Sequence, residues 1–300
     1  MTLSGFLGVA QMAKASTGST LGTTSSLDTL DNADSTSTPA PVNIPGSLVL
    51  TTNVVTANTA FIGFSLGDAS TFAILDEGTG SGSLNLTNDT VKGNIGIGDP
   101  SGKTTTTLNV SKSTVQGSID FAGAIKDSIS GSTVTGSINA NDAQVTTDLT
   151  YLNNLSTTLG KEAGTSVSVP SNATGTLNAN TGKLDSSGNY VFSITSWGAT
   201  NGTFTINGDN LGHNVVINFT AAGCTPNFSN ISLNLTGGLT ADNVLFNITN
   251  SATLTMGSVS GTFLDPNGFV TASNDTITGH LYVGGTANST LSNDTISCSQ

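Results

Sequence analysis

The chain contains no arginine, and only 9% of its 300 residues are charged, against about 25% in ordinary globular proteins. Its seven basic residues are all lysines, and its net charge is −12. Nucleic-acid-binding proteins use clustered lysine and arginine to neutralise phosphates, and arginine also grips phosphate or carboxylate substrates through two parallel hydrogen bonds. The composition therefore predicts no nucleic-acid partner and no anionic substrate. With 35% hydrophobic residues, the chain is nevertheless apolar enough to fold.

Long hydrophobic runs are also missing. No apolar stretch approaches the roughly 18 residues that a membrane-spanning helix needs, so we expect no membrane span. The first 16 residues contain a modest apolar stretch followed by Ala13-Lys14-Ala15, which is similar to the end of a secretory signal but lacks a basic start. This segment is either the remnant of a secretion signal or an ordinary strand start, and we expect an extracellular or cell-surface protein.

Cysteine and histidine are scarce. For Cys224 and Cys298 two interpretations are open: a disulfide that closes a long loop, worth about 4 kcal/mol of chain entropy, or two buried free thiols. Neither His213 nor His280 has a Cys, His or Glu at the spacing of a zinc site. The sequence therefore predicts no metal site and no cofactor.

Residues 1–45 are rich in Ser and Thr and read as a tail or linker. Such a segment cannot build a core alone, and adding it as a strand to an open sheet edge of a second copy is the simplest way to order it. From Ser47 the residues become apolar and β-branched, which predicts one or two strands ended by Gly63 and Gly67. We therefore divide the chain into a tail at 1–45 and a β-solenoid domain at 46–300.

An internal repeat determines the expected architecture. A unit of the form Thr-Val-x-Gly-x-Ile, with close variants, places its glycine at Gly93, Gly117, Gly136, Gly261 and Gly279. Spacings of roughly 18 to 24 residues correspond to one coil of a parallel β-solenoid. Stacked coils satisfy their backbone hydrogen bonds between one another, which accounts for a chain with few charges and many turn residues.

One amphipathic helix is predicted between the repeat blocks, at about 141–161. Its apolar residues recur at steps of three and four and make a single stripe: Val145, Leu149, Leu152, Leu155 and Leu159. Asn141 is the expected N-cap, with Gln144 three residues on, and Gly160 or Gly164 is expected to end the helix. We expect this helix to pack along the solenoid.

The order of repeat block, helix and longer repeat block resembles the bacterial ice-binding-like proteins, and most closely their relatives called choice-of-anchor A domains. The residues that carry the resemblance lie at 66–75, 91–98, 215–218, 243–247, 261–267 and 277–281. The resemblance implies a discontinuous, mainly β fold: a parallel β-solenoid with one long helix beside it, on secreted or surface-attached proteins.

Catalytic patterns are missing. Polysaccharide-cleaving solenoids need paired carboxylates or a basic proton acceptor in a groove, whereas the aspartates Asp68, Asp76, Asp89 and Asp120 stand singly. No phosphate loop or nucleophile elbow is present. We therefore expect no enzyme.

The candidate functional residues are outward threonines of the repeat: Thr114, Thr133, Thr135, Thr276 and Thr278. Lys92 and Gln116 interrupt this row. The leading hypothesis is a non-enzymatic extracellular structural or adhesive protein that self-assembles into a layer or fibre through its N-terminal segment. Its partner is then a second copy of itself or a surface ligand. The alternative, implied by the resemblance, is an ice-binding protein that uses a Thr/Ser/Asn-rich face.

Overall fold

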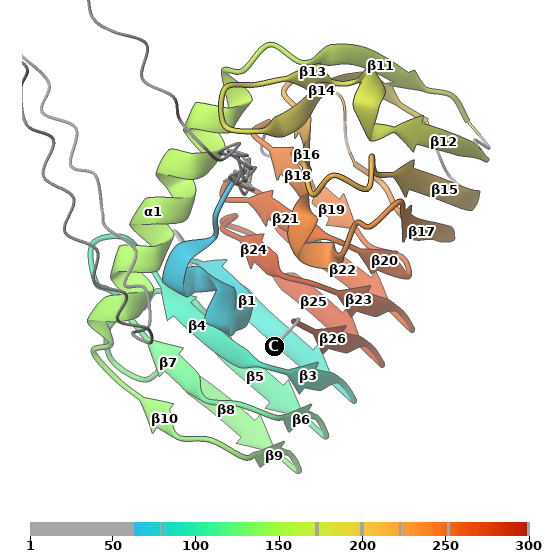
Figure 1. Cartoon of the computed structure of the whole chain (residues 1–300). Coiled ribbons are helices and arrows are strands. Elements are labelled where there is room, and N and C mark those ends of the chain that lie inside the picture. The colour runs from blue at the N-terminus through green and yellow to red at the C-terminus, as the bar shows by residue number, and fades with distance from the viewer. Residues whose placement is uncertain are drawn as a thin grey trace, which may run out of the picture. The chain divides into compact units, whose positions relative to one another are not determined.

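The computed structural model describes residues 63–298, except 79, 81, 172–173, 199–200, 222–223, 225 and 251–252. The tail at 1–45 and the strands expected between Ser47 and Ile62 lie outside the described residues. Within the described part the chain winds into coils, and each complete coil contributes one strand to each of three stacks (Figure 1). The expected parallel β-solenoid is thereby confirmed.

The first stack, which we call the covered sheet, has helix α1 (Ala143–Gly160) against its outer side. Its strands pair in the following spatial order: β10 (Ile138–Asn139), β7 (Ile119–Phe121), β4 (Asn94–Gly98), β1 (Phe72–Glu77), β24 (Leu281–Val283), β21 (Thr262–Asp265), β18 (Val244–Ile248), β16 (Asn214–Phe219), β14 (Asn189–Trp197) and β11 (Thr165–Val169). The short β13 (Lys183–Leu184) adds to β14 in the antiparallel direction.

Two further stacks face outward. The broad sheet runs through β19 (Thr253–Thr255), β22 (Phe269–Ser273), β25 (Ser289–Ser292), β2 (Ser83–Thr87), β5 (Thr107–Ser111) and β8 (Asp127–Ser130). The narrow sheet runs through β20 (Val259–Ser260), β23 (Thr276–Thr278), β26 (Thr295–Ser297), β3 (Thr90–Lys92), β6 (Thr114–Val115) and β9 (Thr133–Val134). A bridge between Ser232 and Ser258 joins it to a three-stranded sheet of β12 (Gly175–Asn178), β15 (Gly202–Asn207) and β17 (Ile231–Thr236). Single-turn 3₁₀ helices lie at Gly67–Thr71, Ala179–Thr181 and Ala241–Asn243.

The solenoid is discontinuous, as the resemblance implied. The chain begins in the middle of the stack at β1 and coils to one end at β10. Helix α1 then carries it along the covered sheet to the other end at β11, from which it coils back to the middle (Figure 1). The last coil therefore lies directly on the first one: β24 pairs with β1, β25 with β2 and β26 with β3.

The repeated glycines lie at a corner where consecutive coils approach each other closely. A Cβ atom on Gly117 would lie 2.4 Å from the carbonyl oxygen of Gly93, and one on Gly279 would lie 2.2 Å from that of Gly261. Gly93, Gly261 and Gly279 also adopt positive φ angles, between 123° and 144°, which side chains disfavour. Both the spacing between coils and the backbone turn thus require glycine in the repeat unit.

The covered sheet is buried on both sides. Its inward side chains join the solenoid core, while Leu75, Val216 and Leu245 point outward into a second apolar cluster with the helix. From the predicted helical stripe, Val145, Leu149, Leu152 and Leu159 are buried in that cluster and Leu155 packs against it, which confirms how the helix packs.

The predicted N-cap was wrong by one residue. Asp142 is the N-cap, and its carboxylate accepts a hydrogen bond of 2.8 Å from the Gln144 backbone N–H. Asn141 instead adopts a φ of 56°, the left-handed conformation that asparagine tolerates, and turns the chain into the helix. Gly160 ends the helix, as expected.

Two buried asparagines hold the carboxyl end of α1. Asn218 donates a hydrogen bond of 2.8 Å to the Leu159 carbonyl, one of the helix carbonyls that lack an intrahelical partner. Asn247 donates to Asn218 Oδ1 at 2.8 Å and to the Ser156 carbonyl at 3.0 Å, and it accepts from the Ser156 hydroxyl at 2.6 Å. Both asparagines are fully buried, so the sheet aligns the helix through polar as well as apolar contacts.

Candidate functional site

The threonines predicted from the repeat lie on the narrow sheet, and three of them share one column. Because the last coil stacks on the first, the column runs without interruption through Thr276, Thr295, Thr90, Thr114 and Thr133. Sequence reasoning missed Thr90 and Thr295 as members. Their signal was the Asn-Asp-Thr motif at residues 88 and 293, but only the pairing of β26 with β3 makes them neighbours.

The two other predicted threonines, Thr135 and Thr278, are not neighbours. Thr278 pairs with Ser297, which pairs with Lys92, and Thr135 lies at the far end of the same row beyond Gln116. Lys92 and Gln116 are exposed, so they interrupt this second column of the narrow sheet. The strands here are only two or three residues long, and the regular surface is a single column wide.

The broad sheet presents a wider regular surface, which sequence reasoning did not identify. Its middle outward column is Thr255, Thr271, Thr290, Asn85, Asn109 and Ser128. The next outward column is Ser273, Ser292, Thr87, Ser111 and Ser130. We call these two columns the hydroxyl–amide face.

The geometry of the hydroxyl–amide face follows from the sheet. Strand spacing sets about 4.8 Å between neighbours in a column, and the two-residue period sets about 7 Å between columns. Asn109 Nδ2 donates to Asn85 Oδ1 at 2.8 Å, which holds those two amides in line. Strands β19, β22, β25, β2 and β5 carry no charged side chain. The signal in the sequence was the pair Ser-Leu-Asn-Leu-Thr at 83–87 and Thr-Leu-Asn-Val-Ser at 107–111, whose alternation predicts half-buried strands.

A hydrogen-bonded corner fixes the angle between the broad and narrow sheets. The backbone N–H of Asp275 donates to Asp294 Oδ1 at 2.7 Å, that of Asp294 to Asp89 Oδ1 at 2.7 Å, and that of Asp89 to Ser113 Oγ at 3.0 Å. Burial raises the pKa of Asp89 to about 6, and the neighbouring Asp294 carboxylate adds to the rise. These carboxylates already bind backbone amides, so they serve the fold.

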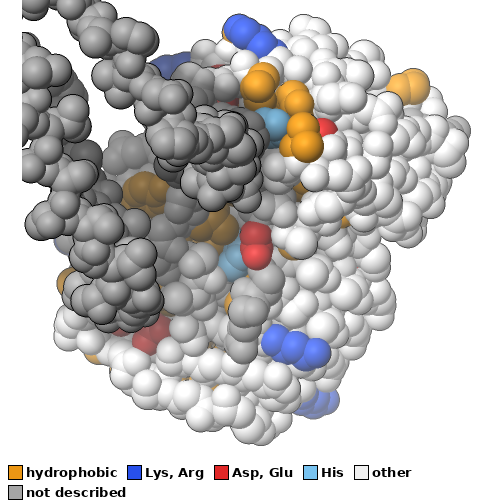
Figure 2. All heavy atoms as spheres, in the orientation of Figure 1, with side chains coloured by type: hydrophobic (Ala, Val, Ile, Leu, Met, Phe, Trp, Pro, Cys, Tyr) orange, Lys and Arg blue, Asp and Glu red, His pale blue; other side chains and the backbone are white. Residues whose placement is uncertain are grey.

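Side chains on the rest of the surface are mostly neither charged nor hydrophobic, as the face drawn in Figure 2 illustrates. Among the described residues, no three His, Cys, Asp or Glu side chains lie close enough together to hold a metal ion. No helix of the described part is long and apolar enough to cross a membrane.

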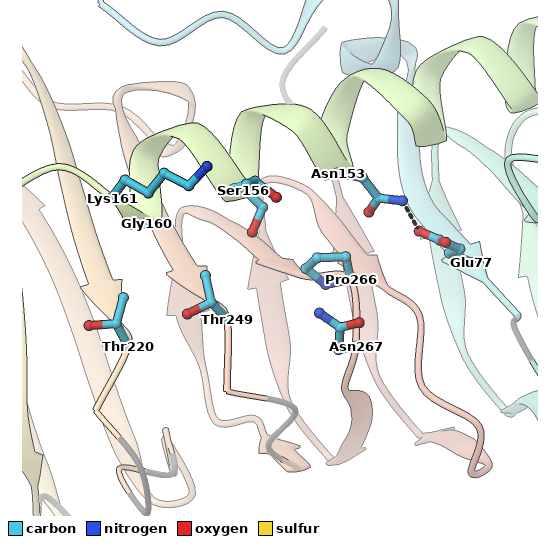
Figure 3. Close-up of a pocket in the computed structure, with 10 residues that line it drawn as sticks. Glu77, Asn153, Ser156, Gly160, Lys161, Thr220, Thr249, Pro266 and Asn267 are labelled. Atoms are coloured by element: carbon cyan, nitrogen blue, oxygen red, sulfur yellow. Dashed lines mark hydrogen bonds between the residues drawn. The ribbon is translucent and has the colours of Figure 1, made fainter.

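A groove of about 460 Å³ lies between the second half of α1 and the ends of the covered strands (Figure 3). Glu77 is its one acidic lining residue; it accepts a hydrogen bond of 2.6 Å from Asn153 Nδ2, and burial raises its pKa to about 7. Lys161 lines the opposite end. Glycoside hydrolysis needs two carboxyl groups across the scissile bond, and this lining offers one. The groove therefore lacks the acid–base pair of a glycosidase.

Two carboxyl groups are buried in the core beside this groove. Asp76 and Asp265 belong to one inward column, with Val283 between them. The pKa of each is raised to about 7, mainly by burial, and the adjacent Glu77 contributes to the rise for Asp76. The carboxylate oxygens of Asp265 accept no well-aligned hydrogen bond, although the backbone amides of Asn267 and Gly268 lie close by. These groups affect stability rather than line an accessible site.

Both histidines contact neighbouring groups of the fold. His213 contacts Asp209 and lies against the Tyr190 ring with centroids 5.0 Å apart. His280 is buried, with Nδ1 2.8 Å from the Phe72 carbonyl.

The cysteines do not form the candidate disulfide. Both are free thiols. Cys224 lies beside Ala221 and Asn250, whereas Cys298 donates to the Lys92 carbonyl at 3.3 Å. The two thiols lie in coils that do not touch: Cys224 follows β16, and Cys298 follows β26, which is stacked between β23 and β3.

The described residues form a parallel β-solenoid with a regular outer face that is charged on only one of its six strands. A family model described as an ice-binding-like adhesive domain matches residues 20–292, and the chain belongs to this family. No curated protein sequence matches the chain.

Solved structures agree with the fold. An ice-binding protein from the Antarctic ascomycete Antarctomyces psychrotrophicus is 19% identical, with 79% of this chain and 99% of that chain covered and a TM-score of 0.50. An ice-binding protein from an Arctic yeast is 16% identical, with 80% and 95% covered and a TM-score of 0.49. At 19% identity, the likeness to the ascomycete protein shows the fold alone.

Proposed function

We propose that the protein is a non-enzymatic extracellular adhesive domain whose hydroxyl–amide face binds an uncharged, hydroxyl-bearing solid surface such as a neutral polysaccharide. The observation that carries the proposal is the row Thr255, Thr271, Thr290, Asn85, Asn109 and Ser128 across six consecutive strands. Membership of an ice-binding-like adhesive family supports an extracellular or surface role.

The physical basis is repetition. A single hydroxyl–hydroxyl hydrogen bond to a wetted surface contributes little, because it replaces bonds to water. A rigid row presents many such groups at a fixed spacing, so the ordering entropy is lost once, on folding, rather than at each contact. The absence of charge on five of the six strands means that no strongly hydrated group has to be stripped of water.

Ice is the second candidate surface. The same regularity favours it: outward threonines occupy three successive positions, Thr255, Thr271 and Thr290, and each offers a methyl group beside its hydroxyl. Ice is itself a neutral lattice of hydroxyl groups, so the two candidates differ in the partner and not in the face used.

The test places one lysine on each of the two outward sheets. Thr290→Lys puts an ammonium in the centre of the hydroxyl–amide face, whereas Thr278→Lys puts the same group on an exposed position of the narrow sheet, one coil away. Retention on washed cellulose and chitin particles is measured for the wild type and both variants, together with thermal hysteresis in ice.

We expect wild-type retention on a polysaccharide, at least a tenfold weaker retention of Thr290→Lys and an unchanged Thr278→Lys. Thermal hysteresis without polysaccharide retention would favour ice and overturn the leading proposal. An equal loss in both variants would show that the narrow sheet also contributes and would contradict the assignment of the face.

A further inference from the structure

One end of the solenoid has no cover among the described residues. Strands β8, β9 and β10 form the last rung (Figure 1). Their inward residues Ile129, Val134 and Ile138 continue the core columns of Val110, Val115 and Ile119. The residues of the preceding rung, Val110, Val115 and Ile119, are at most 1% exposed. In the last rung, by contrast, Ile129 and Val134 are half-buried and Ile138 is 37% exposed. The core thus opens to solvent at this end, where repeat proteins ordinarily carry a cap.

Backbone groups at this end are also available for pairing. The N–H of Leu108 donates to the Lys126 carbonyl, and the N–H of Lys112 donates to the Ser130 carbonyl. In a parallel ladder the peptide groups of successive residues point to alternate sides, so those of Asp127 and Ile129 point away from β5. No other described strand pairs with this side of β8. An edge of this kind accepts a further strand.

The opposite end is better closed. Val169, Leu177 and Phe204 line its core and are between 3% and 8% exposed. On the broad and narrow sheets, the outer sides of β19 and β20 are already met by bridges from Asn227 to Thr255 and from Ser232 to Ser258. Within the described residues, β8 and β9 are therefore the places where both outward sheets end open.

The sequence contains an additional coil unit before the described region. Residues 46–51 read Gly-Ser-Leu-Val-Leu-Thr, and residues 82–87, which include strand β2, read Gly-Ser-Leu-Asn-Leu-Thr. The five-residue step from Leu50 to Val55 repeats the steps from Leu86 to Val91, Val110 to Val115 and Leu291 to Ile296, which are successive core positions of the broad and narrow sheets. Residues 46–56 thus have the pattern of one broad strand, a corner and one narrow strand.

This unit has no vacant rung inside its own solenoid, because β2 lies between β25 and β5, and β3 between β26 and β6. Nor can it reach the open end of its own chain. The N–H of Phe64 donates to Asn189 Oδ1 at 2.7 Å, and Asn214 Nδ2 donates to the Phe64 carbonyl, which ties the chain to β14 and β16. Strand β16 is seven positions from β10, or about 34 Å along the stack, whereas the residues 57–63 that join the segment to Phe64 span at most about 29 Å.

We infer that residues 46–56 of one copy complete the open end of a second copy, adding a strand to β8 and one to β9 and linking copies head to tail. In this arrangement Leu50 covers Ile129, Val55 covers Val134, and the free peptide groups of Asp127 and Ile129 gain partners. The column of Leu84 and Leu108 ends at Asp127 in this last rung. The added coil therefore closes two apolar columns, those that end at Ile129 and Val134. The inference goes beyond the proposed function, since binding by the hydroxyl–amide face does not need assembly.

The test uses the full chain and three variants. Leu50→Asp puts a charge at the inward position of the donated strand, and Val49→Asp puts the same charge one residue earlier, at the position that aligns with outward Asn85. Asp127→Pro removes an N–H on the open side of β8 without removing any hydrogen bond to β5. Mass is followed by analytical ultracentrifugation from 1 to 200 μM, and thermal melting is followed by circular dichroism.

We expect the wild type and Val49→Asp to form a series of multiples of 30.0 kDa, and Leu50→Asp and Asp127→Pro each to remain monomeric. A mixture of these two monomers should form only a dimer, because one retains an intact acceptor end and the other an intact donor. A monomeric wild type at all concentrations, or assembly of Leu50→Asp, would overturn the inference. So would a melting temperature of the Leu50→Asp chain below that of the wild type at a concentration where the wild type is also monomeric, since assembly no longer contributes there and the loss would place the segment on its own solenoid. Surface retention of the Leu50→Asp monomer tests the proposed function separately.

Discussion

The covered sheet and the broad sheet are built from the same stacked coils, yet their outer sides have opposite characters. Strand β18 of the covered sheet is buried at all five positions, whereas β2 and β5 of the broad sheet alternate between half-buried and buried. A parallel sheet covered by a helix becomes uniformly apolar, and a sheet with one wet side keeps the alternation. The side that carries the helix is thereby committed to stability, whereas the outward residues of the side without one are free to vary.

The largest difference in stability between the two sheets is expected from apolar packing. Leu245→Ala, under the helix, should lower the free energy of unfolding by about 2–5 kcal/mol, because a buried leucine leaves a cavity. Thr271→Ala, on the hydroxyl–amide face, should change it by no more than about 0.5 kcal/mol. Urea denaturation measures both, and similar losses would mean that the broad sheet also contributes its outer side to the fold.

The second-largest effect on the free energy of unfolding is expected from the polar contacts of the covered sheet. Asn247→Ala removes bonds to Ser156 and Asn218 in a fully buried position, and we expect a loss of about 1–3 kcal/mol in the free energy of unfolding. Asn109→Ala is the matched change on the broad sheet, where the half-buried amide of Asn85 can turn to water. A loss in Asn109→Ala as large as that in Asn247→Ala would contradict the comparison.

The third effect is a dependence on pH that arises inside the covered side. The pKa values of Asp76, Glu77 and Asp265 are raised to about 7, mainly by burial, whereas unfolded carboxyls titrate near 4. Folding therefore takes up protons between pH 4 and 7, so the free energy of unfolding is highest near pH 4 and falls as the pH rises to 7. Asp265→Asn should remove up to about 3 kcal/mol of that fall, since each unit of pKa difference corresponds to about 1.4 kcal/mol. Urea titrations at pH 4, 5.5, 7 and 8 measure it, and stability that increases with pH would refute it.

The smallest effects on stability are expected at exposed positions of the two outward sheets. Thr290→Lys and Thr278→Lys lie on exposed positions, and each should shift the free energy of unfolding by less than about 0.5 kcal/mol. Their melting curves should coincide with that of the wild type while their surface retention differs. A destabilised Thr290→Lys would mean that its loss of binding reflects unfolding, and Thr271→Lys on the neighbouring strand would then replace it.

Sequence reasoning was most successful where a short-range pattern in the sequence reflects a packing requirement. The helix stripe was found because five apolar residues recur at helical steps. The repeat glycines were found because close approach between coils excludes side chains there. The candidate site was found only in part: the repeat led to the narrow sheet, and the alternating strands of the broad sheet were not recognised as a surface.

The sequence by itself determined the class of this protein: a chain without arginine, with a coil-length repeat and one amphipathic helix, has few folds other than a stacked solenoid open to it. Only the tertiary structure decided which repeats are neighbours. The junction of β3 with β26 unites residues about 200 positions apart, and no local period encodes it, because that register is set by the helix that carries the chain from one end of the stack to the other. Among the described residues, the same path leaves one end of the core without a cover, and this is the end at which we propose that a second copy binds.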